Sequence, residues 1–204
     1  MTRRAVRTNF RLWAVLCCVV VLSACSFPGS VKPTVKIGLS APFEGQYRDL
    51  GYEVLYAVRL AVRQRNELGG VGGRYLVEFV ALNDFDEAGE AITQARKMAV
   101  DPGVLAVLGG WSPETAQVAA EEYGRLGLPF LAPAADLSES QPLSPIEEQF
   151  VTEYKTLSGG VPPGPAAIWA YAAANRLLDA LGEAVHAEGV PTRPGVGQAL
   201  NDNS

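Results

Sequence analysis

The sequence has little of what enzymes use for polar chemistry. Its 204 residues include one histidine, His186, and three cysteines. Cys17 and Cys18 lie in an apolar stretch near the N-terminus, so the sequence after that stretch holds a single thiol, Cys25. A single histidine makes a nucleophilic triad or a histidine metal site improbable, and a single thiol excludes an internal disulfide. We therefore expect no catalytic residues, no cofactor and no metal.

Positive charge is also scarce once the N-terminus is set aside. The sequence has 17 Lys and Arg against 22 Asp and Glu. The first 24 residues contain four of the basic residues and none of the acidic ones, which leaves 13 basic and 22 acidic residues and a net charge of −9. A domain this acidic, without a basic stripe, is a poor partner for nucleic acid or for anionic lipid. We predict no nucleic-acid partner.

No apolar run near the N-terminus is long enough to be a comfortable membrane span. Leu12 to Leu22 follows four arginines and precedes two small residues, which is the order of an export signal. The run LSAC, Leu22 to Cys25, resembles the bacterial lipobox, in which the cysteine is acylated and begins the mature protein. The resemblance implies a lipoprotein signal peptide over 1–24 and a lipid anchor on Cys25, outside the cytoplasm. The alternative is an ordinary signal peptide with an incidental cysteine.

Apolar runs and helical patterns alternate after a Pro- and Gly-containing tether at 25–34. The runs that predict strands are Val35–Leu39, Tyr75–Leu82, Val104–Leu108 and Leu128–Ala132, and the patterns that predict helices are Tyr52–Asn66, Glu87–Val100 and a third helix opened by Ser112 and Pro113. Tyr75–Leu82 is almost continuously apolar, which favours a central place in a covered sheet. Strands separated by single helices predict right-handed parallel βαβ units. The predicted fold class is therefore α/β, a doubly wound, mostly parallel sheet flanked by helices.

A long amphipathic helix is predicted from Ala166 to Ala187. Its apolar face is expected to comprise Ile168, Tyr171, Ala172, Leu178, Leu181 and Val185, with Arg176, Asp179, Glu183 and His186 on the opposite face. We expect the apolar face to pack against the sheet.

Two neighbouring strands deliver loops to the same end of the predicted sheet. Val104–Leu108 stops at two glycines before Ser112, a good N-cap, and the next strand stops before Pro133–Asp136. Ligands of open α/β sheets sit beyond the carboxyl ends of the strands, where helix starts present free backbone N–H groups. This is the candidate binding region.

Acidic residues follow the second predicted strand. Asp84, Asp86 and Glu87 could suggest a hard cation. Three acids in one loop without further oxygen ligands are more often solvated, and we expect a solvated loop.

Six short motifs resemble a known family. They are VKIGLSAPFEG, the glycine of DLGYE, NELGGVGG, a strand followed by ND, LGGWSPE and LPFLAPAA. Their order and spacing are similar to those of the leucine-binding family, the periplasmic solute-binding proteins for branched-chain amino acids and amides. The resemblance implies a type I periplasmic-binding-protein fold, whose two lobes close around a ligand and hand it to a membrane transporter. It implies a ligand-binding lobe at 35–136 and an ABC transporter permease as partner.

The second half of the sequence departs from that family. Residues 137–149 are polar and lack an apolar strand where the family crosses into its second lobe, and 150–204 resemble the segment that returns to the first lobe. We therefore expect a single lobe. Sites of this kind enclose roughly 70–90% of a ligand, and one open lobe offers about half of that. A homodimer or a transporter face would have to supply the other wall. The alternative is an interaction or scaffold lipoprotein, or a decayed binding protein, that binds no ligand.

The family's site can be carried over to a few positions. The resemblance places the ligand carboxylate at the start of the third helix and its ammonium in the loop after the fourth strand. The matching residues are Trp111, Ser112 and Thr115 for the first, and Ala134 and Asp136 for the second. An aromatic of the family's first loop aligns best with Leu50, and Tyr47 and Phe43 lie close by in the sequence. Pro113 and Glu114 count against a carboxylate, because one removes a donor and the other adds negative charge. The alternative is that Ser112 is only an N-cap.

Overall fold

The structure is a computed structural model that describes residues 32–133 and 148–202. The chain divides into two units, Met1–Lys32 and Pro33–Ser204, and every described helix and strand belongs to the second. Cys25, the signal peptide at 1–24, most of the tether and nearly all of the crossing segment at 137–149 lie outside the described residues. These assignments stay predictions.

A parallel sheet forms the centre of the second unit. Its four strands lie in the spatial order β2 (Leu76–Asn83), β1 (Thr34–Ala41), β3 (Val104–Leu108) and β4 (Phe130–Leu131). All five residues of β3 are buried, as a strand covered on both faces requires. The predicted α/β fold with a doubly wound parallel sheet is confirmed.

The predicted central place of the second strand is wrong. Among the described strands β2 pairs only with β1 and lies at the side of the sheet, and most of its residues are partly exposed. Its apolar side chains still contact both layers of helices, because Phe79 packs on the core beneath one face while Val80 and Leu82 pack on the core beneath the other. A continuous apolar run therefore indicates that both faces of a strand are covered. It does not indicate whether the strand pairs with one neighbouring strand or with two.

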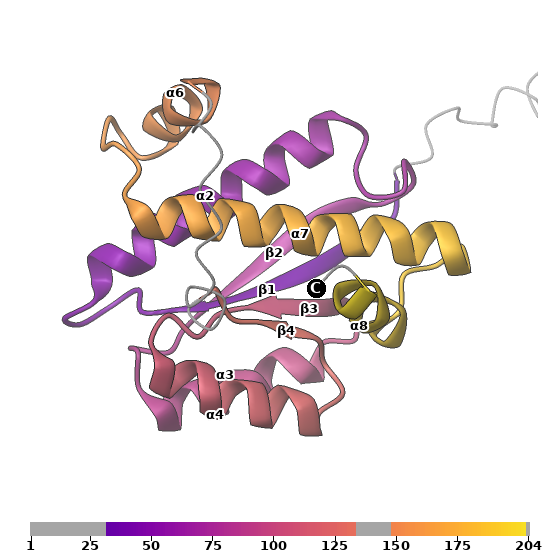
Figure 1. Cartoon of the computed structure of the whole chain (residues 1–204), viewed down its shortest axis with the longest axis horizontal. Coiled ribbons are helices and arrows are strands. Elements are labelled where there is room, and N and C mark those ends of the chain that lie inside the picture. The colour runs from indigo at the N-terminus through magenta and orange to yellow at the C-terminus, as the bar shows by residue number, and fades with distance from the viewer. Residues whose placement is uncertain (1–31, 134–147, 203–204) are drawn as a thin grey trace, which may run out of the picture. The chain divides into compact units, whose positions relative to one another are not determined.

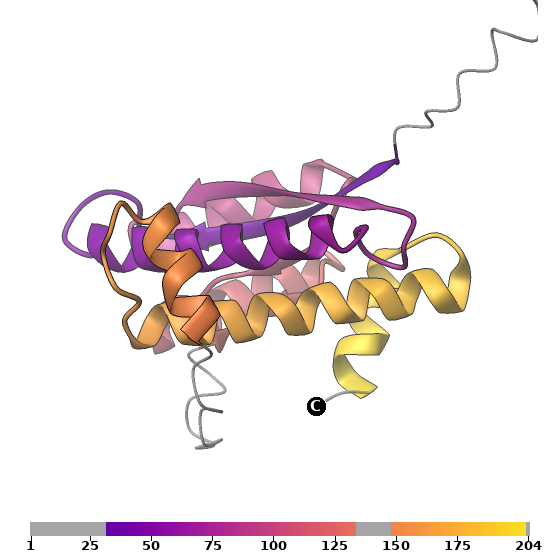
Figure 2. The same ribbon diagram turned by 90° about the horizontal axis from the view of Figure 1, so that it is seen from above.

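Two pairs of helices cover the sheet. α2 (Arg48–Glu67) and α7 (Pro165–Glu188) lie side by side on one face, and α3 (Ala88–Val100) and α4 (Pro113–Arg125) lie on the other (Figure 1). α8 (Arg193–Asp202) packs beside α7, and α6 (Glu148–Leu157) crosses near the starts of α2 and α7 (Figure 2). None of these described helices is both long and apolar enough to cross a membrane.

The two faces have different cores. On the α2/α7 side small residues let the helices approach closely, among them Ala57 and Ala61 of α2 and Ala167, Ala170 and Ala174 of α7, all fully buried. The smaller core under α3 and α4 is built around Tyr123, whose ring stacks on Phe130 at 4.8 Å between centroids. The α2/α7 face therefore carries most of the hydrophobic stabilisation.

The long helix is placed as predicted, with a rotated apolar face. Leu178, Leu181 and Val185 are buried, whereas Ala172 is exposed. The buried stripe follows the alanines of the first half of α7. Alanines are compatible with either face of a helix, so their positions were the weakest part of that prediction.

α2 begins four residues before the predicted start at Tyr52. The loop composition of DLGYE suggested that Gly51 lies outside the helix, but it lies in the first turn and is buried. A Cβ at Gly51 would collide with the carbonyl group of Pro42. The glycine is therefore required for the close approach of α2 to the loop after β1.

Candidate functional site

The loops after β1, β2 and β3 are tied together at the carboxyl end of the sheet. The indole N–H of Trp111 donates a hydrogen bond to the carbonyl oxygen of Ser40 at 2.8 Å. The side-chain oxygen of Asn83 accepts from the backbone N–H groups of Phe43, at 2.8 Å, and Phe85, at 3.1 Å. Of the two loops that the sequence predicted as the binding region, the loop after β3 is thus joined to the loops after β1 and β2, and the loop after β4 lies mostly outside the described residues.

The start of α4 has the cap that the sequence predicted. Ser112 is extended, its Oγ accepts from the Thr115 backbone N–H at 3.4 Å, and the Thr115 hydroxyl accepts from the Ser112 backbone N–H at 3.3 Å. Pro113 occupies the first turn, where its missing N–H costs nothing. The N-cap prediction for Ser112 is confirmed, and two hydroxyl groups stand at the positive end of the helix dipole.

An internal carboxylate already occupies these hydroxyls. Ser112 Oγ donates to Asp86 Oδ1 at 2.8 Å, and Thr115 Oγ1 donates to the same oxygen at 3.0 Å. Asp86 comes from the loop between β2 and α3, which lies beside the start of α4 because α3 and α4 share one face of the sheet. A carboxylate of the protein therefore stands where an incoming anion would contact α4.

The acidic loop after β2 differs from the solvated loop that we expected. Asp84 is only 2% exposed. Its carboxylate accepts from the Ser40 hydroxyl at 2.7 Å and from the Asp86 backbone N–H at 3.0 Å. Burial raises the pKa of the Asp84 carboxyl, and the hydrogen bond from Ser40 opposes this shift. The prediction was wrong for Asp84, because the loop folds back onto the end of β1.

The backbone of this loop is unusual. Phe85 and Asp86 are the only non-glycine residues with positive φ among the described residues, at 54° and 58°. Such left-handed conformations are uncommon for residues with a Cβ, although aspartate tolerates them better than most. The hydrogen bonds of Asn83 and Asp84 to this backbone hold it in place and aim the Asp86 side chain at α4.

The remaining predicted site residues are distributed differently. Trp111 is half-buried against the main core, and Leu50 lies in the first turn of α2 and also packs on that core. Ala134 and Asp136 lie outside the described residues. In place of Leu50, the exposed aromatic side chains at this end are Tyr47, Tyr52 and Phe85, with exposed fractions of 46%, 36% and 38%.

The start of a second helix at this end is also hydrogen-bonded to a carboxylate of the protein. α7 begins after Gly164, which has no capping side chain. Glu53 of α2 supplies one, because its Oε1 accepts from the Ala167 backbone N–H at 2.9 Å. The starts of α4 and α7 are therefore both paired with carboxylates of the protein.

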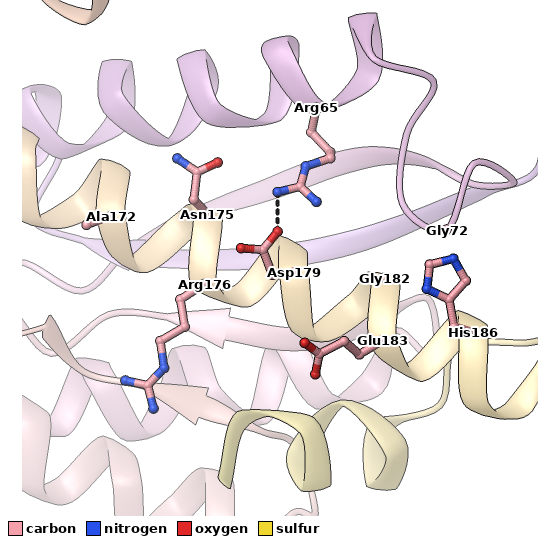
Figure 3. A pocket seen from close by; sticks show the side chains of 9 residues that line it. All are labelled: Arg65, Gly72, Ala172, Asn175, Arg176, Asp179, Gly182, Glu183 and His186. Atoms are coloured by element: carbon pink, nitrogen blue, oxygen red, sulfur yellow. Dashed lines mark hydrogen bonds and ion pairs between the residues drawn. The ribbon is translucent and has the colours of Figure 1, made fainter. Parts of the chain in front are cut away.

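A hollow in the surface lies elsewhere. It has a volume of about 610 Å³ and lies along the polar face of α7, next to α2 (Figure 3). Its lining is largely charged or polar, and Arg65 of α2 forms an ion pair with Asp179 of α7 across it. His186 lies at one end, on the charged face that the sequence predicted. Within the described ranges no three His, Cys, Asp or Glu side chains are grouped to hold a metal ion.

Sequence reasoning missed the importance of Asp86. The signal that was available is its place directly after a strand, at the end of the sheet where ligands bind. What was lacking was the strand order, because only the neighbourhood of α3 and α4 brings the loop after β2 to the start of α4.

Comparisons with solved structures agree with this architecture. The chain superposes on a protein described as a branched-chain amino acid ABC transporter from Rhodospirillum rubrum with a TM-score of 0.69 and 18% identity, over 82% of this chain and 88% of that one. The substrate-binding protein LivJ of Streptococcus pneumoniae, in complex with isoleucine, gives 0.66 and 13% identity over 82% and 87%. A substrate-binding periplasmic protein from Ralstonia solanacearum gives 0.60 and 14% over 82% and 88%. Likeness at these identities establishes the fold.

Sequence comparison supplies the family. No curated protein matches the chain. The family model described as periplasmic binding protein matches residues 34–145, which is more than half of the chain and includes β1 to β4 with the candidate site. The chain therefore belongs to the periplasmic binding protein family.

Proposed function

We propose that the chain is the extracytoplasmic solute-binding lipoprotein of an ABC-type uptake system for amino acids or amides, working with a single lobe. The observation that carries the proposal is the joining of three loops at the carboxyl end of the sheet, the end that also presents Ser112, Thr115 and exposed aromatic side chains. Family membership supports binding and transport as the role, and the proposal assigns no catalytic residue.

The single lobe sets the expected affinity. A ligand on this surface would be covered by the loops after β1 and β3 on one side only, and full enclosure is what makes such sites tight. A second copy or the permease would supply the other wall. We therefore expect the isolated chain to bind aliphatic amino acids and small amides weakly or not at all.

Calorimetric titration tests this expectation. The full chain, purified in detergent, is titrated with leucine, isoleucine and small aliphatic amides. Weak binding, or binding that appears only when the permease is added, supports the proposal. Submicromolar binding by a chain that gel filtration shows to be monomeric would contradict the single-lobe part of it.

The lipid anchor has its own test. If Cys25 is acylated, the chain sediments with the membrane fraction and its mass exceeds that of the cleaved polypeptide by the acyl groups. The Cys25→Ser variant should then leave the membrane fraction. An unmodified Cys25 in a membrane-free chain would refute the anchor and leave ligand binding untouched.

One observation favours the scaffold alternative. Both hydroxyls at the start of α4 are already bonded to Asp86, so they are paired without a ligand. A membrane-anchored interaction protein would need only the fold. Capture of a defined partner that survives substitution of both Ser112 and Asp136, together with absence of ligand binding, would support this alternative.

A further inference from the structure

The geometry at the start of α4 bears on which ligands the lobe accepts. Two hydroxyl groups and the first backbone N–H groups of a helix form a favourable place for an anion. In this protein the anion is built in, because Asp86 Oδ1 accepts from Ser112 Oγ at 2.8 Å and from Thr115 Oγ1 at 3.0 Å. Neither hydroxyl proton remains for a ligand carboxylate.

The position of Asp86 is fixed by its surroundings. Its backbone, at φ 58°, and that of Phe85, at φ 54°, adopt the left-handed conformation. The Asp86 N–H is held by the buried carboxylate of Asp84, which is held in turn by Ser40 of β1. Several interactions therefore converge to keep this carboxylate against α4, at the expense of backbone strain.

The charged side chains of the loop between β2 and α3 and of the first turn of α4 are carboxylates. Asp84 lies behind Asp86, and Glu114 is exposed in the first turn of α4. A second carboxylate that came within contact distance of Asp86 would be repelled, whereas an amide can donate a hydrogen bond to it. The exposed aromatic rings of Tyr47, Tyr52 and Phe85 provide apolar contact area at the same end.

We propose that Asp86 sets the ligand specificity of this lobe. By occupying the anion position at the start of α4, it excludes free carboxylates and favours ligands that present an amide to this end of the sheet. The proposal rests on the proposed function, since it assumes that the lobe binds a small solute there. It narrows the ligand class from amino acids or amides to amides.

Two matched substitutions test the role of Asp86. Asp86→Gly removes the carboxylate and tolerates a positive φ, so it should vacate the anion position without straining the loop. Asp86→Asn keeps an acceptor oxygen for Ser112 and Thr115 but removes the charge. Thermal unfolding of each variant confirms that it is folded before binding is measured.

The first measurement compares leucine with leucinamide, which share the side chain and the ammonium group and differ in the carboxylate. We expect the native chain to prefer leucinamide by at least about tenfold, Asp86→Gly to lose that preference, and Asp86→Asn, which still accepts from both hydroxyls, to keep part of it. Equal affinity of the native chain for the two compounds would overturn the specificity assigned to Asp86, while leaving a solute-binding function intact.

The second measurement does not depend on the solute and uses inorganic sulfate as probe. The melting temperature in sodium sulfate is compared with that in sodium chloride of equal ionic strength, which removes the effect of charge screening. The general stabilisation of folded proteins by sulfate cancels when each variant is compared with the native chain. Asp86→Gly should gain about 3 °C more from sulfate than the native chain does, and Asp86→Asn should behave like the native chain. If neither leucine compound binds to any variant, the specificity is overturned together with the proposed function, and this shift still tests whether Asp86 fills the anion position. Identical responses of all three proteins would overturn it.

Discussion

The starts and the ends of the helices, which lie at opposite ends of the sheet, are paired with side chains of opposite charge. At the carboxyl end, carboxylates of Asp86 and Glu53 meet the starts of α4 and α7. At the amino end, the guanidinium group of Arg193 donates to three backbone carbonyls, those of Val104 at 2.9 Å, Ala99 at 3.1 Å and Asp101 at 2.8 Å. Carboxylates thus accept hydrogen bonds from the hydroxyl and N–H groups at helix starts. At the other end a guanidinium group donates hydrogen bonds to backbone carbonyls.

The direction of the helices explains this difference. In a parallel sheet with single crossover helices, the helices run opposite to the strands, so helix starts gather at the carboxyl end and helix ends at the amino end. The amino end is a structural joint, where Lys36 also pairs with Asp101 at 2.7 Å. At the carboxyl end the same requirement coincides with the place for a ligand. A ligand carboxylate must therefore compete with groups that stabilise the fold.

Gly51→Ala should have the largest effect and would break the packing at the carboxyl end. The added Cβ collides with the Pro42 carbonyl, which belongs to the loop after β1. We expect a loss of about 3 kcal/mol in the free energy of unfolding, measured by urea denaturation. Gly89→Ala in α3 is the control, because a Cβ there meets nothing within 4 Å. It should be neutral or stabilising by up to about 1 kcal/mol, and a similar change in both variants would argue against the collision.

Arg193→Ala tests the amino end. It leaves three backbone carbonyls at the end of α3 and the start of β3 without their cationic donor. We expect a loss of about 2 kcal/mol in the free energy of unfolding. Arg193→Lys, which keeps the charge but not the fork of donors, should recover only part of it. Full recovery by lysine would mean that charge alone matters at this end.

Ser112→Ala sharpens the comparison from the carboxyl end. It removes the cap of α4 and one of the two hydrogen bonds to Asp86. We expect a loss of about 1 kcal/mol by thermal unfolding. Thr93→Ala removes an exposed hydroxyl within α3 that bonds only to the Gly89 carbonyl and should change stability little. Comparable losses in the two variants would contradict the capping role.

Asp84→Asn should change the free energy of unfolding least of the four variants at low pH. The change should grow as the pH rises. Burial raises the folded-state pKa of the Asp84 carboxyl above its unfolded value. With rising pH the unfolded chain therefore releases this proton first, and the native protein loses stability through the interval between the two pKa values. The asparagine variant avoids this loss, so its stability relative to the native protein should increase above about pH 4. A pH-independent difference between the two proteins would contradict the raised pKa.

Much of the fold followed from local patterns, whereas the site depended on neighbours distant in sequence. β3 and the α4 cap were predictable because the run Val104–Leu108 and the Ser112-Pro113 pair carry their own signals. The side position of β2 was not, because an apolar run indicates covered faces without naming the strand beside it. To predict the role of Asp86, one would have needed the strand order and the shared face of α3 and α4. One would also have needed its left-handed backbone conformation, which an aspartate residue does not by itself indicate.

Trp111 gives the carboxyl end an optical signal of its own. Its indole N–H is bonded to the Ser40 carbonyl, within the same set of loops that holds Asp84 and Asp86. The sequence contains two other tryptophans, Trp13 and Trp169. Replacing both by phenylalanine would leave an emitter whose fluorescence wavelength follows the polarity around these loops. Entry of a solute, or the departure of Asp86 from α4, could then be followed in real time.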